Sequence, residues 1–140
     1  MKQMIALALS TLLVSTTIFA DSREAIVVSA KNRDALLHEM RQLLRSSQLI
    51  LDGIVKNDME LVEKAARKSG MGMTGRTPPE VIRILPKAFK ALGPGVHKGF
   101  EQIANEADGF GDTQKILSIL AKTQNNCVAC HEIYRFEVKD

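Results

Sequence analysis

The chain has 140 residues and a formal net charge of +3, from 19 basic and 16 acidic side chains. So small a surplus does not indicate the basic surface that nucleic-acid binding requires, so we expect no nucleic-acid partner. Aromatic residues are sparse, with five Phe, one Tyr and no Trp. The core is therefore expected to be aliphatic.

Residues 1–20 have the composition of a secretory signal peptide. Lys2 supplies one positive charge, and a mostly apolar run then extends to the small residue Ala20. We expect cleavage before Asp21, which leaves 21–140 as one domain and lowers the formal charge to +2. An uncleaved membrane anchor is the alternative. It is disfavoured because the run is near the lower length limit for a membrane span and contains several Ser and Thr residues.

The rest of the chain has the apolar periodicity of amphipathic helices and almost no strand signal. The predicted helices cover about residues 31–56, 57–70, 78–92, 94–107 and 112–137. Pro86 is expected to kink or split the third helix, and Gly93-Pro94-Gly95 to end it. The short apolar run 26–28 is expected to be the frayed start of the first helix. These patterns predict an all-α fold.

The most specific signal is the stretch Cys127-Val128-Ala129-Cys130-His131. C-x-x-C-H is the attachment signature of c-type haem. Two thiols at this spacing can add to the two haem vinyl groups, and the histidine that follows can bind the iron. In a helix the three side chains lie at i, i+3 and i+4, so they share one face. We therefore expect one covalent haem c on Cys127 and Cys130, with His131 as the proximal iron ligand.

Other interpretations of these residues are weaker. A thioredoxin-like redox pair is expected near a βαβ pattern, which the sequence does not show. A structural zinc site usually needs about four N or S ligands. Here a second C-x-x-C is missing, and His38 and His97 lack the ligand spacing. A plain disulfide or two idle thiols is the remaining alternative. Haem attachment also agrees with export, since c-type haem is attached outside the bacterial cytoplasm.

These features resemble the class II c-type cytochromes, the cytochrome c′ family. The matching residues are Cys127 to His131 with Tyr134-Arg135 after them, the C-x-x-C-H-x-x-[YF]-R ending, and, as weaker matches, Leu85-Pro86 to Phe89 and Gly93-Pro94-Gly95. The resemblance spans essentially the mature chain, although only the C-terminal motif is specific. It implies an up-down four-helix bundle with the haem between the helices near one end. The segment 79–92 departs from the family pattern, because it replaces part of the long second helix.

The resemblance also implies that the first helix crosses the distal face of the haem. Met40 lies in that helix and is our candidate for the sixth iron ligand, which gives His/Met iron suited to electron transfer. Ordinary core packing is the alternative role for Met40, since Met fills irregular gaps well. Leu37 over an open iron position is the second option. The remaining candidate ligands are Met71, Met73, His38 and His97.

The remaining candidates have simpler interpretations. His38 is expected to face solvent, and His97 to cap a helix or lie on the surface. Met71 and Met73 are expected in a mobile loop between glycines. Arg135 lies one turn past His131. It is expected either near the proximal side or a haem propionate, as the resemblance suggests, or in solvent.

The sequence thus predicts a periplasmic electron-transfer cytochrome that is not an enzyme. No Ser/His/Asp order or matched carboxylate pair for catalysis is visible. We expect periplasmic redox proteins as partners and no membrane association; the oligomeric state is open, with a homodimer among the options. The alternatives are a five-coordinate cytochrome that binds gases such as nitric oxide, and an electron-supplying subunit of an oxidoreductase.

Overall fold

The computed structural model describes residues 21–139, so the predicted signal peptide and its cleavage site before Asp21 lie at or beyond the edge of the described chain. The elements, in order, are β1 (Glu24–Val28), α1 (Ala30–Lys56), α2 (Met59–Ser69), the 3₁₀ turn η1 (Met71–Met73), α3 (Pro79–Ile84), α4 (Lys87–Asp108), α5 (Thr113–Ile133) and β2 (Tyr134–Val138). The described chain is mostly helical, as the sequence predicts. None of its helices is both long enough and apolar enough to cross a membrane.

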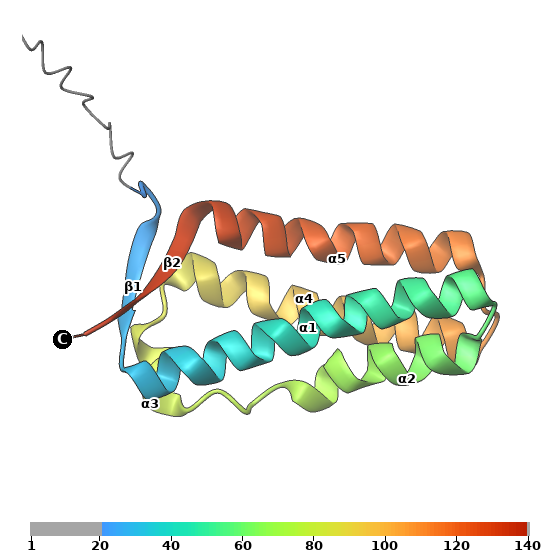
Figure 1. Cartoon of the computed structure of the whole chain (residues 1–140), viewed down its shortest axis with the longest axis horizontal. Coiled ribbons are helices and arrows are strands. Elements are labelled where there is room, and N and C mark those ends of the chain that lie inside the picture. Colours follow the sequence, from blue (N-terminus) through green and yellow to red (C-terminus); the bar gives the residue numbers. More distant parts are fainter. Residues whose placement is uncertain (1–20, 140) are drawn as a thin grey trace, which may run out of the picture.

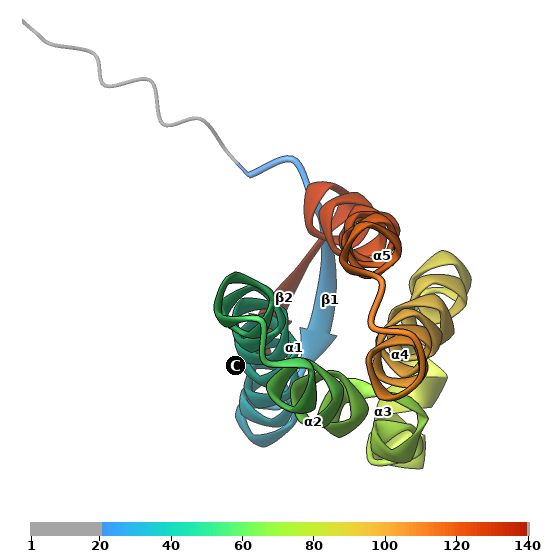
Figure 2. The same cartoon turned by 90° about the vertical axis from the view of Figure 1, so that its right-hand side faces the viewer.

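Helices α1, α2, α4 and α5 lie alongside one another along the long axis of the molecule (Figure 1). α2 packs against both α1 and α4, and α4 packs against α5. α1 and α5 approach each other at few points, although the end-on view in Figure 2 places them on neighbouring corners. We call this loosely packed flank the α1–α5 side.

Two apolar clusters fill the interior. The larger cluster joins α1, α2, α4 and α5, and Phe100 and Ile103 of α4 are almost completely buried in it. The smaller cluster lies at the strand end of the molecule, and its buried members are Ile26, Val28, Leu36, Val81, Leu85 and Tyr134. The two clusters together hold both the helices and the strands in place.

The two short strands β1 and β2 occupy segments that were expected to belong to the first and last helices. Ile26–Val28 does not fray from the first helix but lies in β1, and the last helix ends at Ile133 rather than near residue 137. β1 and β2 pair in parallel, from Glu24 opposite Tyr134 to Val28 opposite Val138. The exposed Val27 lies between two buried residues, which is the period of a strand.

The length of helix α4 differs from the expectation that a helix ends at Gly93-Pro94-Gly95. Gly93-Pro94-Gly95 does not end a helix, because α4 runs through all three residues. Pro94 removes one internal hydrogen bond, a cost of roughly 3 kcal/mol in a helix interior. The buried side chains just after it, among them Val96 and Phe100, favour continuation, because tertiary packing overrides local propensity. Pro86, in contrast, separates α3 from α4 as predicted.

Candidate haem-attachment site

The C-x-x-C-H motif lies in the last two turns of α5. Cys127 and Cys130 are half-buried and form no disulfide. Cys127 packs against the larger apolar cluster and Cys130 against the smaller one, so the two thiols lie where both clusters reach α5. They continue the line of Ile116, Leu120 and Thr123, which are buried along the same helix. The motif therefore lies on the core-facing side of α5.

His131 follows directly on the same side of the helix. Its side chain is exposed, and no described residue forms a hydrogen bond with its imidazole. Its backbone carbonyl accepts a hydrogen bond from Nη1 of Arg23 at 3.3 Å. The ring nitrogens of His131 are therefore available to a ligand, while its backbone is tied to the N-terminal segment.

The surroundings of the two thiols disfavour a redox dithiol. Burial raises the pKa of both Cys127 and Cys130, and the neighbouring Cys127 raises that of Cys130 further. The negative end of the α5 dipole acts in the same direction, because the motif lies at the C-terminal end of the helix. Redox-active cysteines depend instead on a lowered thiol pKa, as at a helix N-terminus.

Met40 occupies the core-facing side of α1. It is half-buried, and the two residues that follow it at heptad spacing face inward: Ser47 is buried, and Ile54 packs against the larger cluster. Because seven residues make about two helical turns, Met40 lies on the same side of α1 as these two. Neither Met40 nor the half-buried Leu37 belongs to either cluster of the described chain. Both side chains keep an exposed part that another apolar group could cover.

Several large aliphatic side chains of α1 and α5 are exposed. On α1, Leu44 is 71% exposed and Leu51 is 38% exposed, and on α5 Val128 is 55% exposed. α1 meets α2 on its opposite flank, where a Cβ on Gly53 would contact Val62. Leu37, Leu44 and Leu51 follow heptad spacing and so form one stripe beside Met40.

These side chains suit a haem. Two free thiols, an available imidazole, a thioether and an aliphatic stripe are the donors and walls that a covalent haem requires. Exposed apolar surface of this kind normally marks a contact with a further apolar group. The residues of the motif and the apolar side chains of α1 are therefore compatible with the expected haem.

His97 contradicts the expectation that it caps a helix or lies on the surface. It is 8% exposed, because α4 continues through the Gly-Pro-Gly stretch and turns this residue inward. Its Nδ1 lies 2.9 Å from the Ser69 carbonyl oxygen, and its Nε2 lies 3.6 Å from the Glu39 carboxylate. Hydrogen bonding to Glu39 is the main cause that raises the pKa of His97. Both ring nitrogens face protein groups, which disfavours His97 as an iron ligand.

The other alternative ligands differ in their exposure. His38 is exposed as expected, with its Nε2 2.7 Å from the Gln42 side chain. Met73 was expected in a mobile loop with Met71, but it is 4% exposed and ends the turn η1. Met71 is about half exposed. Met73 lines a cavity of about 280 Å³ between α1 and the segment that joins η1 to α3.

Arg135 lies in β2, not in a continued helix. Its Nε donates a hydrogen bond to the Arg23 carbonyl oxygen at 3.2 Å, and its Nη1 pairs with the carboxylate of Glu137. A contact with a haem propionate would have to compete with these partners. The role of Arg135 at the haem therefore remains a prediction.

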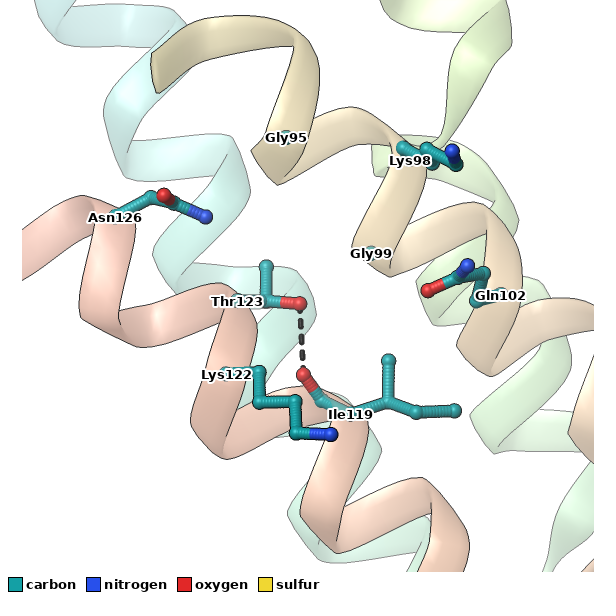
Figure 3. Close-up of a pocket in the computed structure, with 8 residues that line it drawn as sticks. All are labelled: Gly95, Lys98, Gly99, Gln102, Ile119, Lys122, Thr123 and Asn126. Carbon is teal, nitrogen blue, oxygen red and sulfur yellow. Dashed lines mark hydrogen bonds between the residues drawn. The ribbon is translucent and has the colours of Figure 1, made fainter.

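A second cavity of about 200 Å³ lies between α4 and α5 beside the motif (Figure 3). Its lining residues are Gly95, Lys98, Gly99, Gln102, Ile119, Lys122, Thr123 and Asn126. Thr123 donates a hydrogen bond to the Ile119 carbonyl oxygen at 2.8 Å, and a Cβ on Gly99 would clash with Thr123. Glycine at this position therefore lets α4 approach α5 closely next to Cys127.

The buried polar contacts were not anticipated from the sequence. Besides the His97–Glu39 pair, Ser69 donates a hydrogen bond to the Ser46 hydroxyl at 2.7 Å in the interior. Within residues 21–139, no three His, Cys, Asp or Glu side chains converge on a point where they could hold a metal ion. Comparisons of the chain with protein-family models, curated proteins and solved structures found no match.

Proposed function

We propose that this protein is a periplasmic electron-transfer cytochrome that carries one covalent haem c. The observation that supports it most is the placement of C-x-x-C-H on the core-facing side of α5, with both thiols free and half-buried. Cys127 and Cys130 would hold the haem through thioethers, and His131 would bind the iron. Together with the family resemblance, this arrangement favours an up-down four-helix bundle formed by α1, α2, α4 and α5.

We assign the sixth iron position to Met40. Bound haem supplies a one-electron ferric/ferrous couple, and a methionine thioether favours the ferrous state. The aliphatic side chains of Leu37 and Leu44 would exclude water from the haem face, which also limits reorganisation during electron transfer. Such a protein needs no catalytic side chains, only a rigid ligand set and a haem edge close to its redox partners in the periplasm.

The second candidate function is gas binding. Leu37 lies one turn before Met40 on α1 and is also half-buried. If Leu37 rather than Met40 faces the iron, the sixth position stays open to small gases such as nitric oxide. The spin state of the iron separates the two functions.

Covalent attachment is tested first. The protein produced in a host that exports and attaches c-type haem should keep its haem in acidic organic solvent and on a denaturing gel. The Cys127→Ala/Cys130→Ala variant should release any haem under the same conditions, and each single variant should keep one thioether. Wild-type protein that folds normally without haem would contradict the proposal.

The spectrum of the purified holoprotein tests the second step. Low-spin visible bands together with a near-infrared methionine–iron charge-transfer band support His/Met ligation and electron transfer. High-spin bands with rapid carbon monoxide binding support the gas-binding alternative.

A further inference from the structure

The β1–β2 pair connects α1 and α5, two neighbouring helices that approach each other at few points. β2 begins at Tyr134, directly after α5 ends at Ile133, and β1 ends at Val28, just before α1 begins at Ala30. Because the strands are parallel, the start of β1 lies beside the end of α5, and the end of β1 leads into α1. The strand therefore spans the distance from the end of α5 to the start of α1 (Figure 1).

The length of β1 makes this distance larger than ordinary helix packing allows. Each strand has five residues, and five residues extend over roughly 16 Å. Packed helices lie about 8–10 Å apart. In both Figure 1 and Figure 2 the start of α1 lies farther from α5 than its end does. The wide end is the one that carries Cys127, Cys130 and His131.

We propose that the β1–β2 pair is a spacer that sets the separation of α1 and α5 at the haem end, and thereby positions Met40 relative to His131. This inference rests on the proposed haem and its axial ligands. A strand of fixed length holds its two ends at a defined distance, whereas a flexible linker would let α1 collapse onto α5. Ile26 and its neighbours in β1 are thus positioning residues for iron ligation.

Apolar packing anchors the spacer at both ends. Ile26 and Val28 of β1 are 4% and 3% exposed. They share the smaller cluster with Leu36 of α1 and Tyr134 of β2, and Cys130 packs against the same cluster. A shift of β1 would therefore move α1 and one haem-attaching cysteine relative to each other.

Polar contacts join the spacer to the motif itself. Nη1 of Arg23 reaches the His131 carbonyl oxygen at 3.3 Å, and Nε of Arg135 reaches the Arg23 carbonyl oxygen at 3.2 Å. Asp21 accepts hydrogen bonds from Arg23 and lies 3.9 Å from Arg135. These exposed pairs add little stability individually. Their value is geometric, since they fix the N-terminal segment against the turn that carries the proximal histidine.

Matched alanine variants of the haem-loaded protein test the spacer. Ile26→Ala shortens a buried side chain in β1, Ile103→Ala makes the same change in α4, and Val27→Ala changes the exposed neighbour in the strand. Ile26→Ala should convert part of the haem from low-spin to high-spin, lower the reduction potential and admit carbon monoxide. Ile103→Ala should lose comparable thermal stability and keep the wild-type spectrum and potential, as should Val27→Ala.

A stronger variant, Ile26→Asp, is compared with Val27→Asp. If the wild type has low-spin His/Met haem and both Ile26 variants keep its spectrum and potential, the spacer role is wrong while the proposed function stands. Should Ile26→Asp fail to fold, the result with Ile26→Ala decides.

Hydrogen exchange tests the spacer without reference to haem. Ile26→Ala should speed amide exchange in the first turns of α1 and the last turns of α5 by roughly tenfold, whereas Val27→Ala should not. If the wild type takes no haem, or only high-spin haem, the proposed function or its axial ligand fails, and this measurement still decides on the spacer. Unchanged exchange at both helix ends would overturn it.

Discussion

Met40 is the residue on which the choice between electron transfer and gas binding depends. It continues the core-facing line of Ser47 and Ile54, yet it belongs to neither apolar cluster. A side chain that served only as core filling would be expected inside one of them. Its position in the first half of α1 is compatible with the proposed role of an iron ligand.

We predict that Met40→Ala converts the haem to high-spin and lowers the reduction potential, because the soft ligand that favours ferrous iron is gone. The variant should also bind carbon monoxide. The fold should survive with a loss of about 2 kcal/mol, the lower end for truncation of a core methionine, since the side chain is only half-buried. Absorption spectra and redox titration measure the first effects, and denaturant unfolding measures the last.

Two other methionines provide the controls for Met40→Ala. Met73→Ala removes a buried side chain and should lose at least as much stability, but its haem should stay low-spin. Met71→Ala should change neither property much. If Met40→Ala remains low-spin and another variant becomes high-spin, Met40 is not the ligand.

The buried His97 leads to a prediction about how the free energy of unfolding depends on pH. Its pKa is raised above the ordinary value of 6.5, chiefly through Glu39, so the folded state binds the imidazole proton more tightly than the unfolded state. The resulting stabilisation is present below about pH 6.5 and disappears as the pH rises through the raised pKa. The free energy of unfolding of the wild type should therefore fall over this range. His97→Gln should reduce that slope, as measured by urea unfolding at a series of pH values.

The exposed His38 is the control for His97, because its hydrogen-bond partner in the described chain is the neutral side chain of Gln42 rather than a carboxylate. His38→Gln should leave the slope unchanged. An equal slope in the wild type and in His97→Gln would show that the His97–Glu39 pair does not contribute to it.

Among the secondary-structure elements, the sequence predicted the helices that follow from local apolar periodicity. It missed the elements whose formation depends on contacts with distant parts of the chain. The apolar spacing over 31–56 predicted α1 within one residue of its observed start. The strand β1 was missed because five residues carry a weak signal alone, and its partner lies at the other end of the chain. Continuation of α4 through Pro94 was missed because its cause is burial against other helices.

The candidate site shows the same division. Cys127, Cys130 and His131 could be proposed as a haem site from spacing alone, because c-type haem attachment requires that spacing. The burial of Met73 and His97 could not, since each depends on where another helix or turn packs. The spacer depends on the pairing of β1 with β2, and no local sequence pattern predicts that pairing.

Gly99 gives a prediction for the contact between α4 and α5. Gly99→Ala should destabilise the fold by about 1–3 kcal/mol, because its Cβ would clash with Thr123 and force the helices apart. Gly93→Ala in the same helix should change stability less, since a Cβ there meets nothing within 4 Å beyond its chain neighbours, although Pro94 after it disfavours helical backbone at a residue with a Cβ. Thermal unfolding measures both. Equal stability of the two variants would mean that α4 and α5 are not this close.

For the whole molecule, the predicted export has a direct test. Mass spectrometry of protein from the periplasm should show a chain that begins at Asp21 or within a few residues of it. A chain cleaved there keeps Asp21, whose pKa is lowered to about 2 by its hydrogen bonds with Arg23. An intact Met1 would support a membrane anchor instead.

The pairing of the two chain ends has a consequence for the order of folding. Arg23 and His131 are 108 residues apart in the sequence, so the sheet is among the most non-local contacts in the protein. Contacts of this kind form slowly, because nearly the whole chain must lose conformational entropy before the contacts contribute any stabilisation. A polypeptide that crosses a membrane from its N-terminus delivers β1 first and β2 last. In the proposed export, the cysteines would arrive just ahead of β2 and would stay accessible for haem attachment until β2 pairs with β1.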